Sequence, residues 1–422
     1  MMIKANDITR KSWINYDKNS DFPIQNIPFG VFKTKEEKVH IGTIIGETVI
    51  SLSKLEELGY FKSTDLKHNV FQHNNLNLFL KQGKKIWRQV RDSLAILFDA
   101  NNQELQKNKE HQKIILYRIK DVINIKPVEI GDYTDFYSSK DHAMNVGKMF
   151  RDPDNALLPN WLHLPVGYHG RSSSIVISGV DIQRPSGQIL PKGEKIPIFS
   201  KSKLLDFEVE MGFITGDGKD LGQSISTNEA EDYIFGLCLF NDWSARDIQK
   251  FEYVPLGPFL GKSFASSISP WIITLDALEH FRIKGEKQIP EVTEYLKYEG
   301  KKNYDINLEV ILKTEQGNST KISESNFKYM YWNMCQQLAH HTINGCNIKA
   351  GDLMASGTIS GPTKKEYGSM LELSWGGTKE LKLKNGEIRK FLLDNDTVII
   401  RGFCVDKNIR IGFGEVANTI KG

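Results

Sequence analysis

Two glutamates, two residues apart, form the first candidate site. Glu208 and Glu210 alternate with Phe207, Val209 and Met211 at the period of a β-strand, so both carboxylates project from the face opposite the apolar side chains. Carboxylates placed in this way repel each other unless water or a cation separates them. The pattern predicts either a cation site on a rigid strand or the polar face of a half-exposed strand, and the spacing alone does not choose between them.

Two aspartates at predicted strand–helix junctions are further candidates. Asp242 follows the apolar run 235–240 and precedes a predicted helix, and Asp135 precedes a helix predicted to begin near Ser138 or Ser139. Each aspartate is equally typical of a helix N-cap. If both converge with the two glutamates, the resulting all-oxygen site suits a hard ion, Mg²⁺ or Ca²⁺, and not zinc.

The segment after Asp242 places a cation, an amide and a phenol at helical spacing. Arg246, Gln249 and Tyr253 are three and four residues apart, so a helix presents them on one face. Such a set can stabilise an oxyanion and hold a substrate. The alternative is an arginine that only forms an ion pair with Asp242 or with Glu252.

Two glycine-containing segments contribute further polar groups. Lys262 follows Gly261, but Gly257 lies only four residues before Gly261, so the spacing of a phosphate-binding P-loop is absent. The segment 355–361 is rich in small and hydroxylic residues. It either presents backbone N–H groups and the hydroxyl of Thr358 to a carboxylate or forms a simple turn.

A histidine and a distant glutamate are candidates for proton transfer. His142 lies in the first turns of the helix predicted after residue 139, and a general base needs the near-neutral pKa typical of histidine. Glu372 is predicted to point away from the packed face of a strand over 370–375, either as a surface residue or as the partner that orients a histidine. The adjacent pair His340 and His341 lacks the H-E-x-x-H pattern and is interpreted as structural.

Two domains of β-rich α+β type are expected to position these residues. The 422-residue chain is too long for one compact core. A small β-rich domain over residues 1–120 is predicted from strands at 30–32 and 39–51 and a helix over 76–98. A catalytic domain over 121–422 is predicted from a helix over 327–341 and from short strands at 204–213, 233–240, 306–312, 370–375 and 397–402.

Composition excludes several classes of function. Hydrophobic residues make up 40% of the chain and charged residues 25%, as is ordinary for a soluble globular protein. The net charge of +3 and the absence of a dense basic tract argue against nucleic-acid binding. No run of eighteen apolar residues predicts a membrane span, and no signal-peptide core is present. Four scattered cysteines favour a reduced, cytoplasmic protein.

Several long strings resemble the fumarylacetoacetase family. They extend from the N-terminal region to the C-terminal third and therefore cover nearly the whole chain. The strings are DFPIQNIPFGV (21–31), DYTDFYSS (132–139), ALLPNW (156–161), PVGYHGR (165–171), NDWSARDIQ (241–249), YVPLGPFLGKS (253–263) and ASGTISG (355–361).

The resemblance implies roles for individual residues. The family's metal ligands match Asp135, Glu208, Glu210 and Asp242, and its further cation positions match Lys262 and Ser266. The expected residues at 265 and 266 are Gly and Thr, whereas this chain has Ala265 and Ser266, and the serine keeps a hydroxyl. The general base matches His142, its carboxylate partner Glu372, and the oxyanion group Arg246, Gln249 and Lys262. The substrate contacts match Tyr137, Arg151, Tyr168, Gln249, Tyr253 and Thr358.

The resemblance also implies a fold and a reaction. We expect a small N-terminal β-barrel domain, a C-terminal mixed β-sandwich roll and a homodimer. The implied reaction is metal-dependent hydrolysis of the carbon–carbon bond of 4-fumarylacetoacetate to fumarate and acetoacetate, the last step of tyrosine and phenylalanine breakdown, with Mg²⁺ or Ca²⁺. The alternatives are an acylpyruvate-type diketo-acid hydrolase, disfavoured by the long N-terminal domain, and a non-catalytic metal-binding relative.

Overall fold

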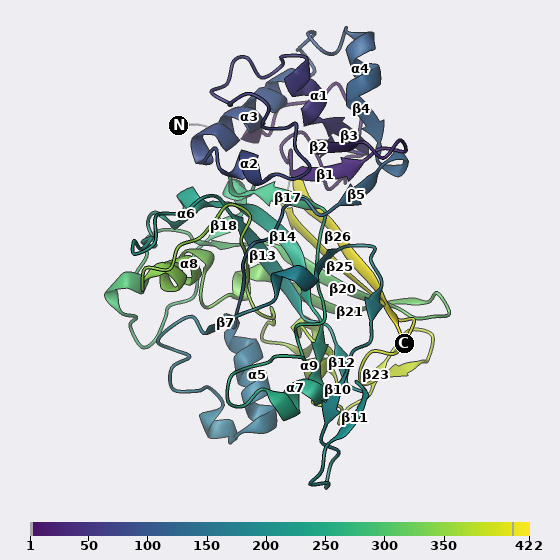
Figure 1. Ribbon diagram of the computed structural model, residues 1–422, viewed down its shortest axis with the longest axis vertical. Helices are drawn as coiled ribbons and strands as arrows, with labels where there is room; N and C mark the ends of the chain where they lie inside the picture. Colours follow the sequence, from purple (N-terminus) through teal and green to yellow (C-terminus); the bar gives the residue numbers. More distant parts are fainter. Residues whose placement is uncertain (1–2, 407–408) are drawn as a thin grey trace.

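The computed structural model describes residues 3–406 and 409–422 and shows a smaller N-terminal part seated on one end of a larger part (Figure 1). The two parts share an apolar core, because Phe29 and Phe79 both pack edge-on against Phe235 at ring-centroid distances of 5.5 and 5.7 Å. No helix in the described ranges is long and apolar enough to cross a membrane.

A single mixed sheet runs through both parts. Strand β1 of the N-terminal part pairs with β17 through Phe29 opposite Ile272 and Gly30 opposite Trp271. Neighbouring strands in this sheet follow the order β4 (Leu116–Arg118), β3 (Thr48–Ser51), β2 (Val39–Ile45), β1 (Phe29–Lys33), β17 (Trp271–Thr274), β14 (Ile234–Asp242), β13 (Val209–Thr215), β22 (Leu353–Ala355), β6 (Tyr133–Phe136) and β7 (Gly167–His169). Three more strands join from the side, β5 (Ile123–Ile125), β8 (Ile175–Ile177) and β16 (Ser266–Ile268).

The predicted β-rich architecture with mixed sheets is confirmed. Strand β22 pairs with β13 antiparallel and with β6 parallel, so the sheet is mixed. The strand order is open at both ends among the described residues, so the small N-terminal barrel stays a prediction.

Helices cover the N-terminal strands. They are α1 (Leu52–Glu57), α2 (Asn77–Leu80), α3 (Lys84–Leu97) and α4 (Lys109–Ile115). The single helix predicted over 76–98 is wrong, because Gly83 at φ +80° lies between α2 and α3. A left-handed glycine ends one helix and allows the chain to start the next in a new direction.

A second sheet packs against the first in the C-terminal part. In β20, Leu308, Val310 and Leu312 are buried on alternate positions and form its core face. Strands β25 and β26 of this sheet contact β14 of the large sheet. Its strand order is β21 (Ser319–Asn326), β20 (Asn307–Lys313), β25 (Thr397–Val405), β26 (Arg410–Lys421) and β9 (Ile182–Gln183).

Two predicted elements of this part are corrected. The helix expected over 327–341 begins only at Met334 and runs to Thr342 as α8, because Asn333 forms a capping box there. The strand expected over 370–375 is instead a single helical turn, α9 (Met370–Leu373). The side chain of Ser369 accepts a hydrogen bond from the backbone of Glu372, which favours the turn over an extended chain.

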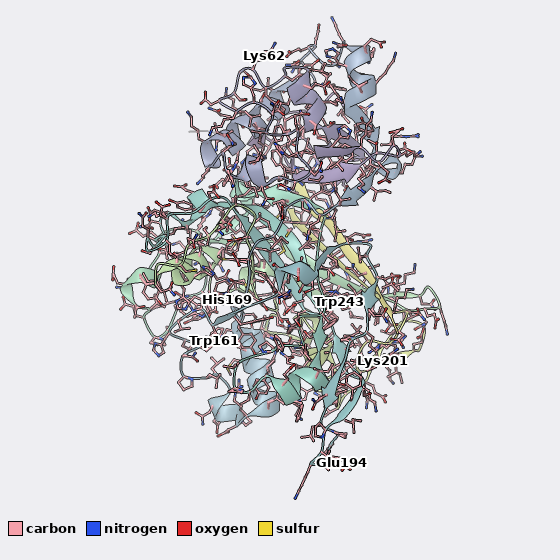
Figure 2. All side chains as sticks on the ribbon, viewed as in Figure 1. Lys62, Trp161, His169, Glu194, Lys201 and Trp243 are labelled. Atoms are coloured by element: carbon pink, nitrogen blue, oxygen red, sulfur yellow. The ribbon has the colours of Figure 1, made fainter. Side chains whose placement is uncertain are left out.

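Short elements complete the C-terminal part. The hairpin of β10 (Ser186–Ile189) and β11 (Ile198–Lys201) projects from the body, with Glu194 near its tip and Trp243 inside the molecule (Figure 2). The other elements are α5 (Lys140–Phe150), α6 (Ala230–Tyr233), α7 (Arg246–Glu252), β12 (Leu205–Asp206), β15 (Ser244–Ala245), β18 (Arg282–Ile283), β19 (Asn303–Tyr304), β23 (Leu381–Lys382) and β24 (Ile388–Arg389).

Candidate functional site

The large sheet brings the four predicted acids together. Glu208 immediately precedes β13, Glu210 lies on it, and Asp242 ends the neighbouring strand β14, where its N–H donates to the carbonyl of Glu208 at 3.2 Å. Asp135 lies on β6, across β22 from β13. One carboxylate oxygen from each residue falls within 4.8 Å of the others, and all four are buried. The exposed-strand alternative for the two glutamates is therefore wrong.

Two cationic side chains, those of Lys262 and Arg246, lie against this cluster. The ammonium of Lys262 contacts the Oε2 of Glu208 and lies 2.6 Å from Oδ2 of Asp242. Burial is the largest single influence on Glu208 and opposes its ionisation, but the charge of Lys262 and the other cationic neighbours together outweigh burial and lower the pKa of that carboxyl. The charges of Arg246 and His142 act on Glu208 in the same direction. Of the four acids, Glu208 is thus the one held ionised by the protein itself.

For two other acids of the cluster, Asp135 and Glu210, the pKa is raised instead of lowered. Burial raises the pKa of Asp135 well above its usual range, and the neighbouring charge of Asp242 raises it further. Burial and the charge of Asp135 do the same for Glu210. Asp135 Oδ1 and Glu210 Oε1 are buried without a hydrogen-bond partner among the described residues. Buried acceptors of this kind are costly unless a cation or a proton satisfies them.

These observations fit a hard divalent cation. Four carboxyl groups face the two cationic side chains of Lys262 and Arg246, so acidic groups outnumber cationic ones. Oxygen-only ligands suit Mg²⁺ or Ca²⁺, and the unpartnered oxygens are the free ligand positions such an ion requires. The buried acidic cluster therefore has the composition of a binding site for a hard divalent cation.

A glycine lets the backbone approach this cluster. The N–H of Gly357 donates to Glu210 Oε2 at 3.0 Å, as predicted for a loop that presents N–H groups to a carboxylate. Its φ is +76°, and a Cβ there would lie 2.2 Å from the carbonyl oxygen of Phe136. Only glycine fits this position without moving the neighbouring strand. Thr358, next in the chain, is buried beside it.

Hydroxyl groups complete the ring of contacts around Asp242. Ser266 Oγ on β16 donates to Asp242 Oδ1 at 2.8 Å, and the phenol of Tyr168 on β7 donates to Oδ2 at 3.3 Å. Both elements are placed by strand pairing, with Ser266 opposite Asp242 and Tyr168 opposite Asp135. The serine that departs from the expected threonine therefore still reaches the carboxylate cluster.

His142 and Glu372 form a buried pair. His142 lies in the first turn of α5, whose N-cap is Ser139, and its Nδ1 is 2.7 Å from Glu372 Oε2. Burial opposes ionisation of Glu372, but the charge of His142 and its hydrogen bond outweigh it and lower the pKa of the glutamate. The ring of Tyr137 meets that of His142 edge-on at 5.3 Å. The surface interpretation of Glu372 is wrong, because only 1% of it is exposed.

The helix α7 carries the predicted cation, amide and phenol. Arg246 donates through Nε to Asp206 at 2.8 Å, its Nη2 lies 2.7 Å from Glu208 Oε1, and its Nη1 donates to Gln249 at 3.2 Å. The alternative partners considered from the sequence, Asp242 and Glu252, are replaced by Asp206 and Glu208. The N-cap position of α7 is Ala245, so Asp242 does not cap that helix.

Two predicted substrate contacts lie outside the carboxylate cluster. Tyr253 is the C-cap residue of α7 and is about half exposed. Arg151, at the end of α5, donates through Nε and Nη2 to the carbonyl of Ala156 at 3.0 and 2.7 Å. No described contact joins either residue to the four acids.

Several supporting residues were missed from the sequence. Glu372 also accepts hydrogen bonds from Asn145, Ser360 and Ser369 at 2.8, 2.8 and 2.9 Å. Asp206 is completely buried against Arg246. The period-two alternation that selects Glu208 and Glu210 extends back to Asp206 and is the one signal available for it.

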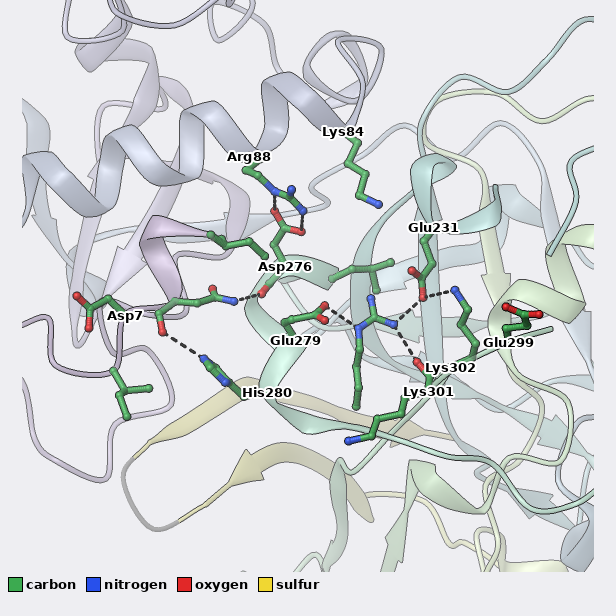
Figure 3. Close-up of a pocket in the computed structure, with 16 residues that line it drawn as sticks. Asp7, Lys84, Arg88, Glu231, Asp276, Glu279, His280, Glu299, Lys301 and Lys302 are labelled. Carbon is green, nitrogen blue, oxygen red and sulfur yellow. Dashed lines mark hydrogen bonds and ion pairs between the residues drawn. The ribbon is translucent and has the colours of Figure 1, made fainter. Parts of the chain in front are cut away.

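A large cleft lies elsewhere in the structure. A cleft of about 930 Å³ separates the N-terminal segment and α3 from η5 (Leu275–Phe281) and the loop that ends near Lys302 (Figure 3). Two of its arginines form ion pairs: Arg88 binds both oxygens of Asp276 at 2.6 and 2.7 Å, and Arg282 lies 2.6 Å from Glu231. These four charged groups are therefore satisfied by one another.

Comparison with known proteins assigns the family. The fumarylacetoacetase N-terminal model matches residues 25–127, and the fumarylacetoacetate (FAA) hydrolase C-terminal model matches residues 132–421. The chain belongs to the fumarylacetoacetase family. Within this family, the fumarylacetoacetase of Dictyostelium discoideum is 50% identical over 416 residues, 97% of each chain. That of Homo sapiens is 50% identical over 411 residues, 97% of this chain and 98% of the human one.

A solved structure supports the fold of this family member. The fumarylacetoacetate hydrolase from Exiguobacterium antarcticum superposes with a TM-score of 0.53 over 94% of this chain and 99% of its own, at 17% identity. The family models and the relatives confirm the predicted family membership, and this superposition supports the predicted mixed-sheet fold.

Proposed function

We propose that the chain hydrolyses the carbon–carbon bond of 4-fumarylacetoacetate to fumarate and acetoacetate. The observation that carries this proposal is the buried His142–Glu372 pair, which lies near the buried cluster of four carboxylates. A general base beside a hard-cation site is what hydrolysis of a 1,3-diketone requires. Identity of about 50% to curated fumarylacetoacetases supports this substrate over a smaller acylpyruvate.

Asp135, Glu208, Glu210 and Asp242 are proposed to hold Mg²⁺ or Ca²⁺, with Lys262 and Ser266 beside them. The bound cation would supply Lewis-acid stabilisation of negative charge on the diketone oxygens. Lys262 neutralises part of the cluster through Glu208 and Asp242, so it limits the repulsion that the substrate's own carboxylates meet.

His142 is proposed to take a proton from the attacking water. Glu372 accepts the Nδ1–H hydrogen bond, which leaves Nε2 as the basic nitrogen and fixes the ring plane. Asn145, Ser360 and Ser369 anchor both oxygens of Glu372, so the pair is rigid before substrate binds. An intact, supported pair of this kind argues against the non-catalytic alternative.

Arg246, Gln249 and Lys262 are proposed to stabilise the oxyanion that forms when water adds to the carbonyl. Each well-placed donor in such a role contributes about 3 kcal/mol to transition-state stabilisation. Arg246 and Gln249 are held in contact at 3.2 Å on one face of α7, so they approach the substrate as a unit. Tyr137, Arg151, Tyr168, Tyr253 and Thr358 are proposed to contact the substrate.

The remaining assignments rest on the family. We propose a homodimer that acts in the cytoplasm on a small-molecule substrate, without nucleic acid or membrane as partner. A division into an N-terminal domain over 1–120 and a catalytic domain over 121–422 is supported by the boundary between the two family models, which falls between residues 127 and 132.

The test is direct. Purified protein incubated with fumarylacetoacetate should remove the diketone absorbance and release fumarate and acetoacetate in equal amounts. A chelator should abolish the reaction, and added Mg²⁺ or Ca²⁺ should restore it. Unchanged diketone absorbance in the presence of either cation would refute the proposed function, and turnover of acylpyruvate alone would favour the smaller substrate.

A further inference from the structure

Asp206 joins two parts of the site that the chain does not connect directly. It is completely buried at the end of β12 and makes three hydrogen bonds. Its Oδ2 accepts from Arg246 Nε at 2.8 Å and from the backbone N–H of Leu371 at 3.0 Å, and its Oδ1 accepts from the N–H of Met370 at 2.6 Å. One carboxylate thus contacts the arginine of α7 and the first turn of α9.

The helix α9 depends on these contacts for its position. It is a single turn, and isolated helices this short are unstable in water. The first N–H groups of any helix have no partner within it. Here Ser369 accepts the N–H of Glu372, and Asp206 accepts those of Met370 and Leu371. The side chain that orients His142 is therefore placed by a helix that Asp206 holds.

Arg246 depends on Asp206 as well. Its guanidinium lies between Asp206 and Glu208, at 2.8 and 2.7 Å. Without Asp206, the remaining carboxylate neighbour is Glu208, a proposed cation ligand, and the arginine would be drawn towards the cluster. The two carboxylates on either side hold the guanidinium at a fixed place beside Gln249.

We propose that Asp206 is a positioning residue for the reaction: it fixes the distance between the oxyanion arginine Arg246 and the Glu372–His142 pair. This inference rests on the proposed function. No described hydrogen bond or ion pair joins the side chain of Asp206 to the cation ligands or to His142, so it acts through Arg246 and Glu372. A misplacement of about 1 Å between such groups is enough to lower the rate about 100-fold.

The test is the isosteric substitution Asp206→Asn, which removes the charge and one acceptor. We expect kcat to fall roughly 10- to 100-fold, as for residues that support reactive groups elsewhere, with KM unchanged. Calorimetric titration should still show Mg²⁺ binding, because all four carboxylates remain, with a smaller loss of affinity than in Glu208→Ala. A KM that rises with kcat unchanged, or a wild-type kcat, would overturn the proposal.

Asp396 supplies a matched control. It too is completely buried, binds the Nε and Nη2 of an arginine, Arg389, at 2.9 Å each, and accepts a backbone N–H, that of Leu393, at 2.9 Å. Both Asp206→Asn and Asp396→Asn should lower Tm. Only Asp206→Asn should lower kcat, and Asp396→Asn should leave kcat unchanged. Equal losses of kcat in the two variants would show that general destabilisation, not positioning, explains the effect.

A double variant tests whether Asp206 acts through Glu372. If it does, the losses for Asp206→Asn and Glu372→Gln should not multiply, and the double variant should be little slower than the worse single one. Independent, multiplying losses would contradict the proposal. Asp206→Ser, which is smaller and keeps one acceptor, provides the same comparison if the asparagine variant does not fold.

The two proposals fail in different ways. If the wild-type protein does not hydrolyse fumarylacetoacetate, the proposed function is wrong. If the wild-type protein is active and Asp206→Asn keeps its kcat, only the positioning role is wrong.

Discussion

Two charged regions of this protein differ in one respect that separates chemistry from structure. In the large cleft between the two parts, Arg88 is paired with Asp276 and Arg282 with Glu231. In the carboxylate cluster, acids outnumber cations, and Asp135 Oδ1 and Glu210 Oε1 have no partner among the described residues. Judged by volume and number of charged residues alone, the cleft would be taken as the reactive site. Unsatisfied buried oxygen atoms select the cluster, because they are costly unless a ligand completes them.

The largest expected effect is on the proposed base. His142→Ala should lower kcat by about 10²- to 10⁴-fold, the usual contribution of a general base. Mg²⁺ affinity measured by calorimetry should not change, since the four acids are intact. His340→Ala is the control, because His340 is half-buried and bonds only the phenol of Tyr295 among its described partners, at 2.9 Å. Near-normal turnover in His142→Ala would remove this histidine from the mechanism.

The next effect is on cation binding. Glu208→Ala removes the acid whose pKa the protein lowers, and it leaves Lys262 and Arg246 facing the site with one partner fewer. We expect Mg²⁺ affinity to fall by more than the roughly 10- to 100-fold typical when residues supporting metal ligands are lost. Glu279→Ala, in the cleft, should not alter the titration. Unchanged affinity in Glu208→Ala would exclude Glu208 from the site.

A substitution at Glu210 should have a smaller effect on the free energy of unfolding, with opposite signs in the metal-free and the Mg²⁺-bound protein. Glu210→Gln removes one charge from a cluster in which burial and the charge of Asp135 already raise the pKa of this glutamate. The free energy of unfolding of the metal-free protein at neutral pH should therefore rise, because glutamine has no carboxyl group whose ionisation burial and Asp135 oppose. With saturating Mg²⁺ the wild-type protein should instead be more stable than Glu210→Gln, because it binds the cation more tightly. Thermal unfolding with and without chelator measures both, and a loss of stability in both conditions would contradict the repulsion.

The smallest expected effect is the loss of stability caused by a substitution in the cleft. Asp276→Asn weakens the ion pair with Arg88, which is partly exposed, so the free energy of unfolding should fall by about 1 kcal/mol or less. Neither kcat nor Mg²⁺ affinity should change. Chemical denaturation together with steady-state kinetics tests this. A large loss of kcat would mean that the cleft takes part in the reaction, and the contrast between the two regions would no longer hold.

Much of the site was predictable from residue types, but its assembly was not. The alternation around Glu208 and Glu210 predicted a shared face. Nothing in the spacing could show that β6 reaches β13 through β22, which is what brings Asp135 to the glutamates. Such long-range register follows from packing of the whole sheet, so only the family resemblance joined these acids before the structure did.

The errors have local causes. Residues 370–375 alternate as a strand does, yet Ser369 and Asp206 take up the N–H groups of residues 370–372 and stabilise a helical turn. Residues 76–98 keep helical periodicity across Gly83, whose left-handed backbone divides the helix. In both cases a hydrogen bond or a single glycine overrides a periodicity that the rest of the segment supports.

The pairing of β1 with β17 has a consequence for any shortened form of the chain. Removal of the residues before 121 would strip β17 of β1, so that β17, still paired with β14 on its other side, would become an exposed edge strand. It would also expose Phe235 by removing the rings of Phe29 and Phe79. Bare edges beside apolar surface promote intermolecular β-pairing. The C-terminal segment matched by its own family model should therefore aggregate when expressed alone, although it contains the four acids, the histidine and the arginine of the site.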